Sequence, residues 1–299
     1  MTIVSGKIEP LKALRKIFSE NGVSRFDSIG DINKFLSSYQ SEFDDLPRIG
    51  MNQLDSRIAV LERALKETEE KRAKSFLSRV IYYFRSRSFS KQLSDYQLNY
   101  QTKLEQTISR LKKELDATKS LVDSLYSTIA GAIGETKVVK EIEKLPDTFY
   151  LINDFYIHFN PPIYNKLQEQ RIYSIQVDHV VVSRAGVFLL ETKNWSQKSI
   201  ADYDLRSPVE QVKRTSFGLF VLLNGDSNVE LADHHWGDKK VPLRNIIVMT
   251  NAKPKEEFKY VKVSSLSDLI GYITYFDEIF SDEEVKSIFN YLNTINEAA

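Results

Sequence analysis

The chain has 299 residues, which is enough for one large domain or two smaller ones with a buried core. It contains 41 basic and 41 acidic residues, which excludes a global basic field, so any nucleic-acid binding must use local patches. The lack of cysteine excludes disulfides and thiolate zinc sites. Since neither a signal peptide nor an apolar run long enough to span a membrane is visible, we expect a cytoplasmic protein.

Residues 1–50 are expected to form an N-terminal helical segment. Four apolar residues recur there at helical spacing: Leu11, Leu14, Ile17 and Phe18. Residues 29–36 are predicted to form a second helix that begins after a capping residue. The segment 44–50 contains Pro47 and Gly50 and is predicted to interrupt the helical pattern.

A strict helical periodicity occupies residues 51–129. Apolar positions alternate steps of four and three in two runs, first Leu54, Ile58, Leu61 and Leu65, and then Leu104, Ile108, Leu111, Leu115, Thr118, Val122, Leu125 and Ile129. Two such helices joined by a connecting segment most simply form an antiparallel coiled-coil hairpin. Pairing between chains would give the same pattern, so a homo-oligomer or a partner protein bound through the coiled coil stays open.

The segment 71–94, between the two periodic runs, is basic and aromatic. It contains seven Lys or Arg residues and no acidic residue, with aromatic residues interleaved among them. Such a segment can bind phosphates and stack on bases, and the candidate nucleic-acid-binding residues are Arg79, Arg85, Arg87 and Lys91. The same composition also fits an anionic membrane surface, which is the less favoured partner, or a hairpin tip that packs on itself.

The pattern changes again from residue 130 to residue 299. Strands are predicted at 150–157, 174–183, 186–193, 245–250 and 260–263, and helices at 131–145, 208–223, 265–276 and 281–296. Residues 160–171 are predicted to form a polar loop, because they include Pro161 and Pro162. A helix, a group of strands, a helix and further strands indicate an α/β domain.

Two carboxylates and a lysine are predicted to meet at the ends of neighbouring strands. Asp178 opens one apolar run, and Glu191 and Lys193 close the next run after a short turn. Side chains alternate along a strand, so Glu191 and Lys193 point to one face while Thr192 points to the other. A hairpin between the two strands would bring Asp178 near Glu191.

This set of residues is typical of Mg²⁺-dependent cleavage of a phosphodiester bond. Mg²⁺ prefers oxygen ligands, which Asp178, Glu191 and the carbonyl of Thr192 would supply, and Mn²⁺ is an alternative ion. Lys193 would position the attacking water or stabilise the pentavalent phosphorus. A surface ion pair is the simpler alternative, but the long apolar runs beside these residues favour a site at the ends of core strands.

Five separated motifs, in matching order and spacing, resemble the nuclease-related (NERD) domain of the PD-(D/E)xK restriction-endonuclease-like superfamily. They are Gly134-Glu135, Asp178-His179-Val180-Val181-Val182, Gly186-Val187-Phe188, Glu191-Thr192-Lys193-Asn194-Trp195 and Pro208-x-x-Gln211. The resemblance covers roughly 129–295. It implies a mixed central sheet flanked by helices, with Asp178 and Glu191 as metal ligands and Lys193 as the catalytic lysine.

The resemblance also assigns two residues on helices. Glu135 would be an accessory acid that faces the site, and Gln211 would complete the polar cluster. Without a functional role, Glu135 would be an ordinary acid in a helix and Gln211 a solvated helix residue. His179 follows Asp178 and should face away from the metal by strand alternation, so we expect a buried histidine rather than a ligand.

The sequence therefore predicts a two-part protein, with a helical and coiled-coil region followed by a restriction-endonuclease-like domain. The expected activity is metal-dependent hydrolysis of a nucleic-acid backbone, with DNA ahead of RNA as the substrate. One alternative is a catalytically silent protein of the same fold that binds nucleic acid. Another is a membrane-associated scaffold or sensor that uses the coiled-coil hairpin.

Overall fold

The computed structural model describes residues 1–72, 76–166, 168–197, 205–225 and 239–298. The chain divides into two compact units, one that combines residues 1–24 with 126–299 and one that contains residues 25–125. This division differs from the predicted boundaries after residues 50 and 129. The physical reason is that the first two elements of the chain, a strand and a helix, pack with the C-terminal domain.

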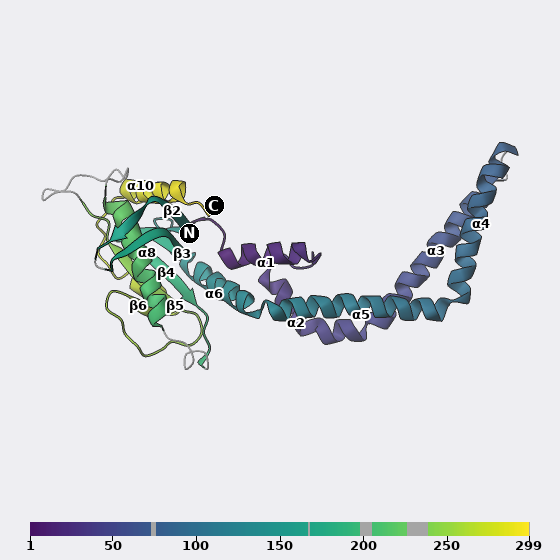
Figure 1. The fold of residues 1–299 in the computed structure, drawn as a ribbon, viewed down its shortest axis with the longest axis horizontal. Coiled ribbons are helices and arrows are strands. Elements are labelled where there is room, and N and C mark those ends of the chain that lie inside the picture. Colours follow the sequence, from purple (N-terminus) through teal and green to yellow (C-terminus); the bar gives the residue numbers. More distant parts are fainter. Residues whose placement is uncertain (73–75, 167, 198–204, 226–238, 299) are drawn as a thin grey trace. The chain divides into compact units, whose positions relative to one another are not determined.

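Six strands among the described residues form one mixed sheet in the first unit (Figure 1). They lie in chain order: β1 (Ile3–Ser5), β2 (Tyr150–Asn165), β3 (Gln170–Ser183), β4 (Gly186–Lys193), β5 (Leu243–Met249) and β6 (Lys262–Ser265). β2, β3 and β4 are antiparallel neighbours, whereas β1 with β2, β4 with β5, and β5 with β6 pair in parallel. Strands β2 to β4 were all predicted, but β1 was not.

The prediction of a polar loop at 160–171 is wrong. β2 and β3 continue as an antiparallel ribbon to the Asn165–Gln170 pair, and Ile172 on that ribbon is fully buried. Pro161 and Pro162 lie where the register shifts between His158 and Ile163. A strand tolerates proline at such an irregularity because the ladder hydrogen bonds are already interrupted there.

Helices cover both faces of the sheet. On one face, α8 (Arg206–Asn224) and α10 (Asp282–Ile295) pack on a core that includes Val180 and Val182. On the other face, α6 (Tyr126–Ile142) and α9 (Leu269–Ile273) pack on a core that includes Val181. Strands that are covered on both faces are apolar at successive positions, which explains the continuous apolar runs of β3 and β4. The mixed sheet flanked by helices confirms the predicted fold class.

The N-terminal residues complete the first unit. β1 pairs with the start of β2, and Thr2 Oγ1 donates hydrogen bonds to the carbonyls of Ile142 and Leu145 at 2.7 and 3.1 Å. The next helix, α1 (Glu9–Glu20), packs against α6 and buries Leu14 and Phe18. The predicted helical periodicity is therefore confirmed, but its apolar face contacts the C-terminal domain.

The second unit consists of paired helices: α2 (Ile29–Asp44), α3 (Leu46–Arg72), α4 (Phe76–Leu98) and α5 (Tyr100–Ser124). Ser28 caps α2, as expected from the sequence. The first half of α3 lies along α5, where Asp55 accepts a hydrogen bond from Tyr100 Oη at 2.9 Å. The second half of α3 lies along α4, where the Arg72 guanidinium lies 5.1 Å from the ring centre of Tyr83. The periodic apolar residues therefore pack within the chain.

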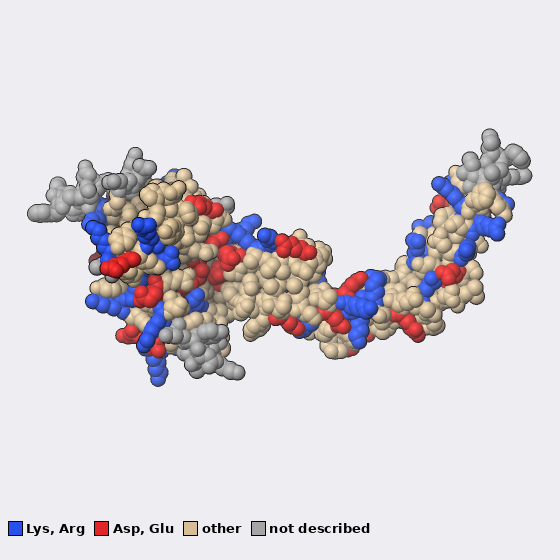
Figure 2. Space-filling model, viewed as in Figure 1, with Lys and Arg blue, Asp and Glu red and all other residues tan. Residues whose placement is uncertain are grey.

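The prediction that 71–94 is a connecting tip is wrong for most of its length, because α4 occupies 76–98. No glycine or proline occurs from residue 51 to residue 130, so nothing in the sequence interrupts a helix there. Arg85, Arg87 and Lys91 consequently lie along α4, and Figure 2 shows Lys and Arg side chains along the α3–α4 pair. Among the described helices, none combines the length and apolar character that a membrane crossing requires.

We expect Leu14→Ala to destabilise the first unit by about 2–5 kcal/mol, the usual cost of truncating a buried leucine. Leu14 is 2% exposed, whereas the control residue Leu98 is 82% exposed. Trp195 belongs to the first unit, and the sequence has no tryptophan between residues 25 and 125, so tryptophan fluorescence in urea reports the unfolding of the first unit. An unchanged transition in Leu14→Ala would show that α1 is not part of this unit.

Candidate active site

The candidate site lies where the ladder between β3 and β4 ends. The last paired residues are His179 and Leu190, so Asp178 and Glu191 are the next residues on the two strands. The backbone N–H of Thr192 has no strand partner on this side and instead donates to Asp178 Oδ2 at 2.6 Å. The predicted approach of Asp178 to Glu191 therefore results from the hairpin register and from this hydrogen bond.

Lys193 contacts Glu191 on the same face of β4. Its Nζ lies 2.8 Å from Glu191 Oε1, and the Glu191 side chain is buried. Burial opposes the charge of Lys193, but Glu191 and then Asp178 favour it, and the pKa of Lys193 is raised. The lysine therefore stays protonated beside the carboxylates.

The carboxyl group of Asp178 is destabilised in its charged form. Burial is the largest cause and the charge of Glu191 is the second, and together they raise its pKa to about 7. The Thr192 N–H and the Lys193 charge oppose this shift without cancelling it. The positive charge of Lys193 therefore does not fully offset the burial of Asp178 and the negative charge of Glu191.

Glu135 reaches this cluster because α6 packs very closely against the end of β4. A Cβ atom on Gly134 would lie 3.0 Å from Asn194 Cβ and 3.3 Å from Thr192 Cγ2, so a larger residue would push the helix away. Glu135 is 7% exposed. Burial, followed by the charge of Asp178, raises its pKa to about 9. Gly134 thus allows α6 to pack closely against the end of β4, and this packing places Glu135 near Asp178.

Asn194 ties the same helix to the strand ends. Its Nδ2 donates to the carbonyl of Ala130 at 2.8 Å, and its Oδ1 accepts from Thr250 Oγ1 at 3.1 Å. The backbone N–H of Thr250 in turn donates to the carbonyl of Lys193 at 3.0 Å. Asn194 therefore positions α6, β4 and the end of β5 around the acids, a role that its place directly after Glu-x-Lys only hinted at.

A family model described as a nuclease-related domain matches residues 130–250. This match is consistent with a nuclease-related (NERD) domain in this part of the chain. The match contains Glu135, Asp178, Glu191 and Lys193, and the sheet and helices around them are consistent with a restriction-endonuclease-like fold. No curated protein and no solved structure matches the chain.

Residues outside the recognised motifs extend the polar cluster of the NERD domain. Asp154, on β2, is buried at a left-handed φ of 52° and forms an ion pair with Lys12 of α1 at 3.0 Å. Its Oδ1 also accepts a hydrogen bond from Gln176 Nε2 at 3.1 Å. The charge of Asp154 contributes to the raised pKa values of Glu135 and Asp178.

Sequence reasoning missed this extension. The polar residues Asn153 and Asp154 interrupt an apolar strand, which indicated that their side chains have hydrogen-bond or ion-pair partners. Nothing in the sequence identified Lys12 as the partner of Asp154. Lys12 Nζ also donates to the carbonyl of Ala298 at 2.7 Å, so it joins three distant parts of the chain.

His179 is fully buried, as expected from strand alternation. Its Nδ1 lies 2.8 Å from Asn153 Oδ1, and burial lowers its pKa to about 3. A neutral imidazole bonded to Asn153 supports the strand pair beside the site. The structure therefore agrees with a structural role for this histidine.

Gln211 is not joined to the acidic cluster by any hydrogen bond between described residues. Its side chain is exposed, whereas Val212 and Thr215 are the α8 residues that line a small cavity with Glu191. Adjacent helix positions point about 100° apart, so the side chain next to Val212 turns away from the sheet. The Pro208-x-x-Gln211 motif does lie on α8, but Val212 and Thr215, rather than Gln211, are the α8 residues that face Glu191.

The proposed nucleic-acid-binding residues belong to the second unit. Arg85, Arg87 and Lys91 are exposed on α4. The side chain of Arg79 lies outside the described residues.

The donor atoms of the site fit a hard divalent cation. Asp178 and Glu191 each offer carboxylate oxygens, and their mutual repulsion would be relieved by a positive ion. Within the described part of the chain, no group of three or more His, Asp or Glu residues is arranged to hold a metal ion. Mg²⁺ takes one or two carboxylates and completes its shell with water and phosphate, so two acids are enough protein ligands for it.

We expect Glu135→Gln to stabilise the metal-free protein at alkaline pH. The folded-state pKa of Glu135 is about 9 against an ordinary value of 4.5, so between these limits the folded state retains a proton that the unfolded state releases. Stability is therefore lost as pH rises, by at most about 1.4 kcal/mol per pH unit, and glutamine removes this loss.

Urea unfolding in EDTA, followed by tryptophan fluorescence at about pH 5 and about pH 8, measures the effect. The exposed Glu256 provides the matched control Glu256→Gln. Equal stability differences between Glu135→Gln and wild type at both pH values would contradict the raised pKa.

Proposed function

We propose that the NERD domain is a metal-dependent nuclease that hydrolyses phosphodiester bonds, of DNA ahead of RNA. The observation that carries this proposal is the meeting of Asp178 and Glu191 at one strand end, with Lys193 Nζ 2.8 Å from Glu191. Two carboxylates and a protonated lysine supply the charges that cleavage of a phosphate diester requires. The family match, to a nuclease-related domain, points to the same chemistry.

In this proposal Asp178, Glu191 and the carbonyl of Thr192 hold Mg²⁺, or Mn²⁺ in its place. The N–H and C=O of one strand residue lie on the same edge of the strand, so the Thr192 carbonyl is directed toward the side on which its N–H meets Asp178. When bound, the cation would lower the pKa of a water and neutralise charge on the scissile phosphate.

Lys193 has two roles that follow from its surroundings. Its ammonium group remains charged beside Glu191, so it can orient the attacking water or bind a phosphate oxygen. The same charge limits the repulsion between the acids. Glu135 approaches from α6 and acts as the accessory acid that the family resemblance assigns to it.

We expect Asp178→Asn and Lys193→Met to reduce cleavage by about 10²–10⁴-fold, the usual loss when a positioned acid–base or charged group is removed. Supercoiled plasmid and single-stranded oligonucleotide are incubated with Mg²⁺, Mn²⁺ or EDTA. The exposed Lys140 on the same domain gives the control variant Lys140→Met, which should cleave as wild type does. Circular dichroism verifies that each variant is folded.

Two results would contradict this proposal. Cleavage that persists in EDTA would remove the requirement for a metal ion. Cleavage that survives both Asp178→Asn and Lys193→Met would place the active site elsewhere. A folded protein that binds nucleic acid without cutting it would instead support the catalytically silent alternative.

We further propose that α4 helps to hold nucleic acid, because its exposed side chains combine charge with aromatic surface. Arg85, Arg87 and Lys91 are exposed, and Phe84 nearby is 69% exposed. We expect the triple alanine variant of the three basic residues to weaken DNA binding and to reduce its salt dependence, since each lost phosphate contact releases one counterion fewer.

A matched control replaces Arg57, Arg63 and Lys66 by alanine, because these exposed residues of α3 carry the same total charge. Binding is measured by fluorescence anisotropy at several salt concentrations. Flotation of the full chain with anionic vesicles tests the membrane alternative. Unchanged DNA binding together with loss of flotation would assign α4 to a lipid surface.

A further inference from the structure

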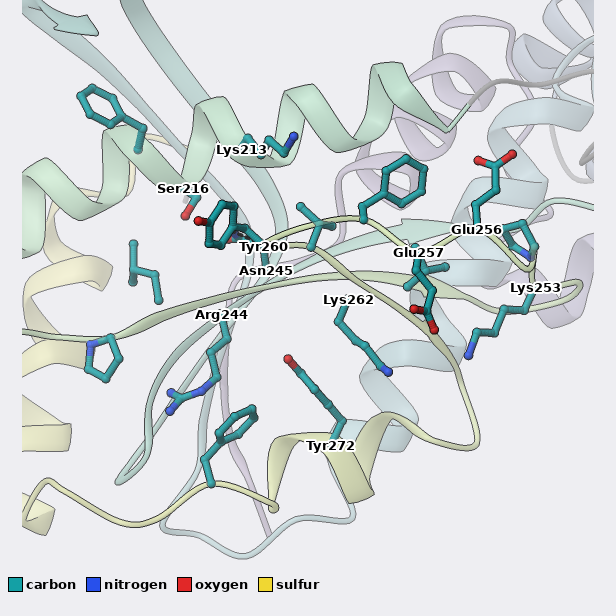
Figure 3. A pocket seen from close by; sticks show the side chains of 18 of the residues that line it. Lys213, Ser216, Arg244, Asn245, Lys253, Glu256, Glu257, Tyr260, Lys262 and Tyr272 are labelled. Carbon is teal, nitrogen blue, oxygen red and sulfur yellow. Dashed lines mark hydrogen bonds between the residues drawn. The ribbon is translucent and has the colours of Figure 1, made fainter. Parts of the chain in front are cut away.

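A pocket of about 1190 Å³ lies at the β5–β6 edge of the sheet, away from the acids of the candidate active site. It is bounded by α8, α9, the start of β5 and the segment that leads into β6 (Figure 3). Its described lining contains five basic residues against two acidic ones, together with six aromatic residues. This composition favours an anionic ligand that also has flat, stackable groups.

Several of the basic side chains are available to a ligand. Lys253, Lys255 and Lys262 are exposed, and none of them forms an ion pair with a described residue. Arg244 is held differently, because its guanidinium lies 3.8 Å from the ring centre of Phe276 and donates to the carbonyl of Ala185 at 2.6 Å. The three lysines are therefore exposed whereas Arg244 is held in place, and Figure 3 shows Arg244, Lys253 and Lys262 among the side chains that line the pocket.

Tyr260 presents an exposed ring at the same pocket. The residue is 74% exposed and has a left-handed φ of 69°, which is unusual for a residue other than glycine. Its carbonyl accepts a hydrogen bond from Asn245 Nδ2 at 3.1 Å, which holds the backbone there. Phe220, on α8, adds a second ring that is 42% exposed. Exposed rings in a basic pocket suit stacking on bases.

Asn245 also offers an unused acceptor. Its Oδ1 is buried and has no hydrogen-bond partner among the described residues, although an amide oxygen accepts hydrogen bonds readily. A buried acceptor without a partner is costly unless a ligand satisfies it. The wall of the pocket therefore contains a polar acceptor that no described group satisfies.

The segment that forms one wall begins at the candidate active site. Thr250 N–H donates to the carbonyl of Lys193, and Ala252 N–H donates to the carbonyl of Trp195, both at 3.0 Å. Lys253 is the next residue and already lines the pocket. A nucleic-acid strand that leaves the catalytic strand end along this segment would meet the pocket lysines.

We propose that this pocket binds a single-stranded stretch of the nucleic acid that the NERD domain cleaves. Lys253, Lys255 and Lys262 bind phosphates, and Tyr260 and Phe220 stack on bases. A duplex keeps its bases stacked on one another and gains nothing from these rings, which is why a single strand is the better ligand. The choice of substrate rests on the proposed nuclease function, but binding itself does not require cleavage.

The test measures fluorescence anisotropy of labelled oligothymidine with the full chain in EDTA. We expect alanine at Lys253, Lys255 and Lys262 together to reduce the log–log salt slope by about 2, because each phosphate contact on a single strand contributes about 0.7. The matched control replaces the exposed Lys137, Lys140 and Lys286, which lie outside the pocket, by alanine.

A second pair of variants tests stacking. Tyr260→Ala should weaken binding of the oligothymidine by about tenfold, within the range for loss of one base–aromatic stack. Tyr275 is 80% exposed but does not line the pocket, so Tyr275→Ala should bind as wild type does. A labelled duplex should bind more weakly and should not respond to Tyr260→Ala.

Three outcomes would overturn the pocket proposal. They are wild-type binding by the triple lysine variant, an equal effect of Tyr260→Ala on duplex, and an equal effect of the lysine variant on polyglutamate, an anion without bases. If the predicted binding losses occur but no metal ion supports cleavage, the nuclease function fails and the pocket stands. If cleavage occurs while every pocket variant binds normally, the pocket fails and the nuclease function stands.

Discussion

The hydrogen bond from the Thr192 backbone to Asp178 is the constraint on which the candidate site depends. It occurs where the β3–β4 ladder ends, so an acid side chain replaces the partner that a strand would have supplied. This hydrogen bond places the carboxylate of Asp178 beside Glu191 on β4. Both acids lie at the ends of buried strands, and burial together with the charge of Glu191 raises the pKa of Asp178.

The surroundings of this bond bring further charge toward the same point. Close packing at Gly134 lets α6 carry Glu135 into the cluster, and Asn194 fastens that helix to the strand ends. From the other side, Lys12 and Asp154 form an ion pair that links α1 to β2. The result is an acidic centre with an incompletely compensated charge, which is the electrostatic state that a bound cation would relieve.

Local patterns predicted much of this arrangement and failed in identifiable ways. The strands around 174–193 were predictable because their apolar runs are long and continuous, and the helices near 208–223 and 281–296 were predictable because they are long and amphipathic. The loop prediction at 160–171 failed because two prolines were interpreted as a strand end, although they occupy a register shift within a continuing ribbon. Gln211 was assigned from its motif, but helix packing presents Val212 and Thr215 to Glu191 instead.

The sequence by itself determined the pairing of Glu191 with Lys193 and the approach of Asp178, because strand alternation and a short hairpin are local rules. The tertiary structure alone decided which further groups join them. Strand β1, the Lys12–Asp154 ion pair, the burial of Glu135 and the pocket along β5 and β6 all depend on contacts between residues far apart in the chain. Such contacts arise when distant segments pack together, and the residues that form them have no characteristic spacing along the sequence.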